Sequence, residues 1–198
     1  ARDALSHDLD LEQAAAALAQ LETHADSLED PQDRAVIRAL AGWETARLAL
    51  AAGDWSRAQA LFATVSMDRG LLPAQQDLAR FEQGLAWCLA GDTERARAVW
   101  QDLLDRQTLW QELLGLPRLA PELELLCRGA LGELPPETLA LRADSQMPSF
   151  RVLGMRVAAE RTTDPDLRRV WKQMAAAAAR PVLPWVYYEV MTSRSPTE

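Results

Sequence analysis

The sequence predicts an all-α protein in which antiparallel helical hairpins stack as a short solenoid. Ala and Leu, both strong helix formers, dominate the chain, whereas β-branched residues are sparse. A helix–turn–helix pattern also occurs twice, in residues 46–62 and 84–100, at an offset of 38 residues. With 198 residues, of which 48% are hydrophobic, the chain is long enough to bury a core.

Each matched position of the repeated unit has a physical explanation. Gly53 and Gly91 can take the left-handed conformation that ends a helix, and Asp54 and Asp92 are placed to cap the next one. Other matched positions hold small residues, which let two helices approach closely, or aromatic residues, which fill the space between hairpins. These pairs are Ala46 and Gly84, Ala58 and Ala96, and Phe62 and Trp100.

This spacing of a small residue, a Gly-Asp turn, an alanine and an aromatic residue resembles the tetratricopeptide repeat (TPR). The resemblance covers residues 39–104. It departs from the family in its period, 38 residues here against about 34 in the family. The extra residues of the longer period are expected to form a linker from Ser66 to Pro73. In addition, the proline that usually closes a repeat has no clean equivalent in this sequence.

Weaker helical patterns flank the repeat. Upstream, residues 10–21 resemble the second helix of a partial hairpin. Downstream, Gly and Pro residues divide the chain into expected helices at about 107–114, 121–131, 136–143, 147–162 and from Asp164 onward. We therefore predict a helical-hairpin array over residues 1–106 and a divergent helical continuation over 107–198, which caps the array.

The last segment, from Pro181 to Met191, is richer in aromatic and β-branched residues than the rest of the chain. It is interpreted as a segment that docks on the chain's own core or, alternatively, as an arm that pairs with a partner chain. Trp185 and Tyr188 are its candidate partner-binding residues.

The resemblance also implies a binding surface, because in that family the first helices of the hairpins line a concave groove that holds peptides or helices. Trp43 and Phe81 would form an aromatic ladder, and Glu44 and Glu82 would flank it with negative charge. The expected partner is a protein segment with apolar anchors and basic character. Alternatively, the chain's own N-terminal helix or tail covers both rings. The further groove positions are Arg47 and Leu85, followed by Leu50 and Cys88.

Other functions find less support in the sequence. We find no phosphate-binding loop, no nucleophile elbow and no spacing typical of metal ligands, so we expect no catalytic residue, cofactor or metal. A net charge of −8 argues against nucleic-acid binding. No apolar run is long enough to span a membrane. Cys88 and Cys127 are interpreted as small buried hydrophobes, or as a disulfide if the compartment is oxidising.

The leading functional prediction is therefore an adaptor or assembly subunit that binds another protein. The alternatives are an accessory domain of the bacterial cell envelope and, from a different class, a helical ligand-binding sensor or enzyme. The chain begins at Ala1 and not at Met, which tilts the expected compartment towards the periplasm or cell envelope rather than the cytoplasm.

Overall fold

The computed structural model describes residues 11–114, 119–144 and 148–179. Within these ranges all regular secondary structure is helical and no strand occurs, which confirms the predicted all-α class. The nine described helices are α1 (Leu11–Ser27), α2 (Pro31–Ala51), α3 (Trp55–Val65), α4 (Pro73–Leu89), α5 (Thr93–Leu114), α6 (Pro121–Leu131), α7 (Pro136–Asp144), α8 (Pro148–Arg161) and α9 (Pro165–Ala179).

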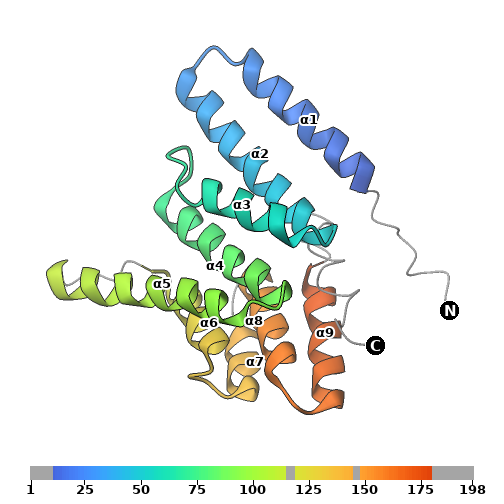
Figure 1. Cartoon of the computed structure of the whole chain (residues 1–198), viewed down its shortest axis with the longest axis vertical. Helices are drawn as coiled ribbons and strands as arrows, with labels where there is room; N and C mark the ends of the chain where they lie inside the picture. The colour runs from blue at the N-terminus through green and yellow to red at the C-terminus, as the bar shows by residue number, and fades with distance from the viewer. Residues whose placement is uncertain (1–10, 115–118, 145–147, 180–198) are drawn as a thin grey trace.

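Each described helix packs against the next one in the chain, and α8 also packs against α6. In Figure 1, α1 to α4 follow one another through the upper half of the molecule, and α6 to α9 gather in the lower half. Helix α5 lies between these two groups, and its C-terminal end projects sideways beyond them. None of the described helices is both long and apolar enough to cross a membrane.

Local residue chemistry accounts for most helix ends. Six of the helices begin at a proline, which has no N–H to leave unpaired and a backbone angle suited to the first helical position. Gly53 and Gly91 end α2 and α4 with φ angles of 76° and 87°, as predicted. The side chain of Asp54 accepts a hydrogen bond from the N–H of Arg57 at 3.1 Å, and Asp92 caps α5 in the same way.

The hydrophobic core consists of two clusters that share α4. The N-terminal cluster lies between α2, α3 and α4 and includes Trp43 and Phe62. The C-terminal cluster extends from α4 to α9 and includes Phe81 and Trp100. Because α4 contributes side chains to both clusters, it is buried on two sides and joins the two halves of the molecule.

Helix α5 differs from the prediction. We expected residues 107–114 to form a separate short helix, but one continuous helix runs from Thr93 to Leu114. The predicted boundary between residues 106 and 107 therefore falls inside α5. The physical reason is that no glycine or proline interrupts this stretch, and Gln107 is buried where its side-chain oxygen accepts the N–H of Leu119 at 2.7 Å.

Candidate functional site

The two aromatic residues expected to line the groove belong to the core instead. Trp43 is 6% exposed and Phe81 is 0% exposed. Trp43 packs in the N-terminal cluster, and the Phe81 ring lies against that of Trp100 with 5.8 Å between ring centroids. These rings therefore do not form the exposed ladder that the sequence predicted, because they fill the space between the chain's own helices.

Glu82 is also buried, at 0% exposure, and it is neutralised within the chain. Trp43 donates from Nε1 to Oε2 of Glu82 at 2.6 Å. Arg47 donates from Nε to the same oxygen at 3.2 Å and from Nη2 to Oε1 at 2.9 Å. This arrangement is a bidentate ion pair in the interior, so Glu82 does not supply the surface negative charge expected along the groove.

Arg47 completes this buried cluster. Its guanidinium lies over the Trp43 ring at 4.2 Å from the ring centroid, and its Nη1 donates to Oε1 of Glu44 at 2.6 Å. Burial raises the pKa of Glu44, while the charge and hydrogen bond of Arg47 act in the opposite direction. Four residues predicted for the groove therefore meet in one cluster between α2 and α4: Trp43, Glu44, Arg47 and Glu82.

The other predicted groove residues line a pocket. A pocket with a volume of about 90 Å³ opens between α4 and α8, and Leu50, Leu85 and Cys88 are all on its wall. We call it the α4–α8 pocket. Its other lining residues are Leu89, Trp100, Ala130, Arg156, Val157, Glu160 and Arg161. Most of the wall is therefore apolar, and the charged groups come from α8.

Two of these charged groups form an ion pair. Nη2 of Arg156 lies 3.0 Å from Oε1 of Glu160, one helical turn further along α8. Nζ of Lys172 lies 3.6 Å from the same oxygen. Burial lowers the pKa of Arg156, and the charge of Glu160 acts against that shift. Glu160 thus interacts with both Arg156 and Lys172.

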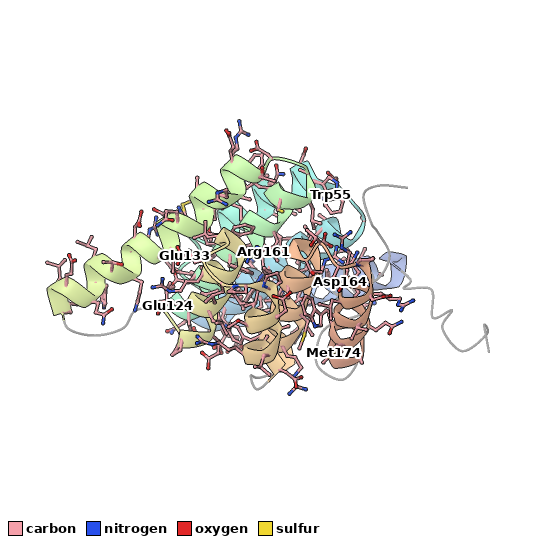
Figure 2. The ribbon with its side chains drawn as sticks, turned by 90° about the horizontal axis from the view of Figure 1, so that it is seen from below. Trp55, Glu124, Glu133, Arg161, Asp164 and Met174 are labelled. Carbon is pink, nitrogen blue, oxygen red and sulfur yellow. The ribbon has the colours of Figure 1, made fainter. Side chains whose placement is uncertain are left out.

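Arg161 is fixed by the end of α6. Its Nη1 donates to the backbone oxygen of Gly129, in the last turn of α6, at 2.5 Å and to that of Leu134, just beyond the helix, at 2.7 Å. These carbonyls carry no net charge, so the two hydrogen bonds do not neutralise the positive charge of the guanidinium. Burial and, second, the charge of Arg97 lower the pKa of Arg161. Figure 2 shows Arg161 near the middle of the molecule.

The two cysteines have different surroundings, and both are free thiols. Cys88 is half-buried on the pocket wall, whereas Cys127 lies fully inside the C-terminal cluster. Burial raises the pKa of Cys88, and the negative charge of Glu160 raises it further. Burial also raises the pKa of Cys127, far above the usual range for a thiol.

Sequence reasoning missed a second surface on α5. Its projecting end exposes large apolar side chains, including Leu113 at 71%. Both views of the molecule show this end standing clear of the neighbouring helices. The sequence did contain a signal for this surface. Four apolar residues form two pairs, and the members of each pair are four residues apart, the spacing that places residues on one helix face. We call these residues the α5 strip: Leu109, Trp110, Leu113 and Leu114.

No protein-family model, curated protein or solved structure matches this chain. Among the described residues, no group of three or more His, Cys, Asp or Glu side chains is placed to hold a metal ion. Trp185 and Tyr188, the other predicted partner-binding residues, lie outside the described residues.

Proposed function

We propose that this protein is a TPR-like interaction scaffold, an adaptor or assembly subunit that holds a segment of another protein on its concave face. The observation that supports the proposal is the α4–α8 pocket. Leu50, Leu85 and Cys88 line it, and these are positions that the repeat pattern assigns to the concave face. The packing of each helix on the next agrees with stacked hairpins but does not by itself define a repeat family.

The size of the pocket suits one apolar side chain of a partner. Burying a leucine-sized side chain contributes about 1.5–3 kcal/mol. Association costs several kcal/mol in lost translational and rotational freedom, on the order of 4 kcal/mol or more. One anchor is therefore insufficient, and a stable complex requires a second contact. The α5 strip is suited to this role, because large apolar side chains are uncommon on an exposed, projecting helix end.

The alternative functions fit this geometry to different degrees. A cell-envelope accessory domain would use the same two surfaces, so the alternative concerns the compartment rather than the mode of binding. Small-molecule sites are usually about 300–1,000 Å³. A hollow of about 360 Å³ lined by α1, α2 and α3 has that volume, so a ligand-binding sensor would use that hollow and not the α4–α8 pocket. The α4–α8 pocket has a volume of about 90 Å³.

The test compares partner capture by a pocket-filling variant and by a matched control. Cys88→Phe places a ring in the pocket, whereas Leu141→Phe places the same ring on the exposed surface of α7. Each full chain is tagged, crosslinked mildly in its native cells, purified and analysed by mass spectrometry. Circular dichroism checks that both variants remain helical.

We expect a partner that the parent and Leu141→Phe retain and Cys88→Phe loses. A crosslink between that partner and α4 or α8 would locate the contact at the pocket. Equal capture by Cys88→Phe and the parent would contradict the proposed site. Failure of the parent to capture any partner would contradict the scaffold function.

A further inference from the structure

We propose that the α4–α8 pocket is also the docking site of the chain's own C-terminal apolar segment, residues 181–191, which competes there with the partner protein. This inference rests on the proposed function and adds the regulation of the same site. The side chain of Leu183 would occupy the pocket, and that of Trp185 would cover its mouth. The segment itself lies outside the described residues.

The chemistry of the segment matches that of the pocket. Apolar and aromatic residues predominate in the segment, and Glu189 is its single charged residue. Most of the pocket wall is apolar as well. An apolar cavity of about 150 Å³ admits a benzene ring. The α4–α8 pocket, at about 90 Å³, therefore suits an aliphatic side chain better than an indole, and Leu183 is the one leucine of the segment.

The segment begins close to the pocket. Nζ of Lys172, on α9, lies 3.6 Å from Oε1 of Glu160, on the pocket wall. Helix α9 ends at Ala179, seven residues after Lys172, which is about 10 Å along a helix. Leu183 follows Ala179 by four residues and can therefore lie up to about 13 Å from the helix end. These two lengths are of the same order, so the segment can approach the pocket while α9 stays on α8.

Other apolar surfaces are less well placed for the segment. The α5 strip lies on the opposite side of the molecule from α9 in both views. The hollow of about 360 Å³ is lined by α1, α2 and α3. The α4–α8 pocket, in contrast, is lined by α8, the helix on which α9 packs.

Covalent attachment explains how one anchor can be sufficient for this segment. A separate partner loses translational and rotational freedom on binding, whereas a segment joined by a few residues has an effective concentration of about 1 mM. An anchor with a dissociation constant of about 1 mM would then fill the pocket about half of the time. The segment would therefore exclude weak partners, and a partner that also contacts the α5 strip would displace it.

The reactivity of Cys88 tests this docking, because its thiol is on the pocket wall. The full-length chain is treated with the neutral reagent methyl methanethiosulfonate. The Cys88 thiolate attacks the sulfenyl sulfur, a mixed disulfide forms and methanesulfinate leaves. Peptide mass spectrometry gives the rate for each cysteine, and protection of the buried Cys127 shows that the chain remains folded.

We expect the double variant Leu183→Ser, Trp185→Ser to be labelled at Cys88 about fivefold faster than the parent. Half occupancy by Leu183 alone would give a twofold difference, and the contact of Trp185 increases it. The matched control is Thr192→Ala, Ser195→Ala, which lies beyond the apolar segment and should keep the parent rate. A synthetic peptide of residues 180–194, added to the double variant at millimolar concentration, should slow the labelling again.

A photocrosslink locates the contact. In the full-length chain Trp185 is replaced by p-benzoylphenylalanine, and the crosslinked peptides are identified by mass spectrometry. We expect links to α4 or α8. Mixing of ¹⁵N-labelled and unlabelled chains distinguishes links within one copy from links between copies, and we expect only the first kind.

Several results would overturn the inference. Equal Cys88 rates in the parent and the double variant would show that the segment does not cover the pocket. Links to Val170 and Met174, which are exposed on α9, would place the segment on another surface. Links between copies would identify a second copy as the binding site, and the absence of any link would likewise contradict docking.

These results are separable from a failure of the proposed function. If the partner is lost by Cys88→Phe while the Cys88 rates of parent and double variant are equal, the scaffold stands and only the competing segment is excluded. If the segment protects Cys88 but neither chain captures a partner, the scaffold function is contradicted instead. If both proposals hold, the double variant should bind the partner about fivefold more tightly than the parent, because more of its pockets are open.

Discussion

Nε1 of Trp43 donates a 2.6 Å hydrogen bond to Oε2 of Glu82, which lies 39 positions further along the chain and has no exposed surface. The bond joins the first helices of the two matched hairpins. Arg47 closes the arrangement by pairing with both oxygens of the same carboxylate. The guanidinium of Arg47 and the indole N–H of Trp43 therefore both stabilise the charge of Glu82 in the interior.

Loss of this carboxylate should be costly. Glu82→Gln removes one of the carboxylates that pair with the buried Arg47, while Glu44 remains paired with it, so we expect the free energy of unfolding to fall by about 3 kcal/mol. Trp43→Phe keeps the ring but removes one donor, and we expect a loss of about 1–2 kcal/mol. Urea unfolding followed by circular dichroism measures both. Glu22→Gln, on the exposed face of α1, is the control and should leave the midpoint unchanged.

The close contact between α4 and α5 depends on Gly84. A Cβ at this position would overlap the indole of Trp100, whose Nε1 donates to the backbone oxygen of Phe81 at 3.1 Å. We expect Gly84→Ala to destabilise the fold by about 1–3 kcal/mol. Adding Trp100→Phe should recover part of that loss, because the matched hairpin pairs Ala46 with the smaller Phe62.

The control for this experiment is Gly42→Ala. A Cβ at Gly42 meets only Val65 at 3.5 Å, which is ordinary packing distance. Alanine is the better helix former, so thermal unfolding should show stabilisation by about 0.5–1 kcal/mol. Similar losses in Gly42→Ala and Gly84→Ala would contradict the steric explanation.

The ionisation of Glu44 should make stability depend on pH in a defined direction. Its folded-state pKa is raised, mainly by burial, above the ordinary value of 4.5. The folded state therefore binds the proton more tightly than the unfolded state. Stability contributed by this group is present below pH 4.5 and is lost as the pH rises through the folded pKa.

Glu44→Gln removes this dependence. We expect the variant to gain stability relative to the parent as the pH rises from 4 to 7, measured by urea unfolding across that range. The net rise in the pKa already includes the opposing effect of Arg47, so the informative quantity is the trend of the stability difference with pH. A difference that shrinks towards neutral pH would contradict the burial effect.

Thiol labelling should separate the two cysteines. Cys88 is half-buried and Cys127 is fully buried, so a small neutral reagent should modify one thiol in the folded chain and two in denaturant. Burial and Glu160 raise the pKa of Cys88 above the ordinary value of 9.0. Its labelling rate should therefore still be rising above pH 9, where an unperturbed thiol begins to level off. Two native-state thiols of equal rate would refute this assignment.

The α5 strip should matter for association and not for folding. Replacing the exposed residues Leu109 and Leu113 by Glu should change the free energy of unfolding by less than about 0.5 kcal/mol per site. Leu103→Ala, in the buried part of the same helix, should cost about 2–5 kcal/mol. Crosslinked partner capture by the Leu109→Glu, Leu113→Glu double variant should be weakened. Undiminished capture would exclude the strip as a contact surface.

Local structure could be predicted from the sequence because neighbouring residues determine it. The expected helix at 121–131 coincides with α6, and the Gly-Asp turns at Gly53 and Gly91 have the expected geometry. A proline or glycine acts within one helical turn, so its effect can be derived without knowing the tertiary fold. The separate helix expected at 107–114 was wrong because the sequence offers no breaker there to support it.

The candidate site was harder to predict, because it depends on residues distant in sequence. Periodicity placed Trp43 and Glu82 on helix faces, but it could not show that these faces meet each other. The ion pair between Arg47 and Glu82 spans 35 positions, and no local pattern reports it. The pocket depends likewise on α8 lying opposite Cys88. The α5 strip did carry a local signal, since Leu109 and Leu113, and likewise Trp110 and Leu114, are four residues apart, the spacing that places apolar residues on one helix face.

The order in which the helices pack also bears on how the chain acquires its structure. Apart from α6, which packs most extensively on α8, each described helix finds its main neighbours next to it in sequence, so most contacts close short loops. Such topologies fold rapidly, because little chain entropy is lost before each contact forms. Helix α1 keeps most of its described side chains exposed and adds none to either core cluster, so it can fray at little cost. Helix α4 contributes side chains to both clusters, so its unfolding would disrupt both parts of the core.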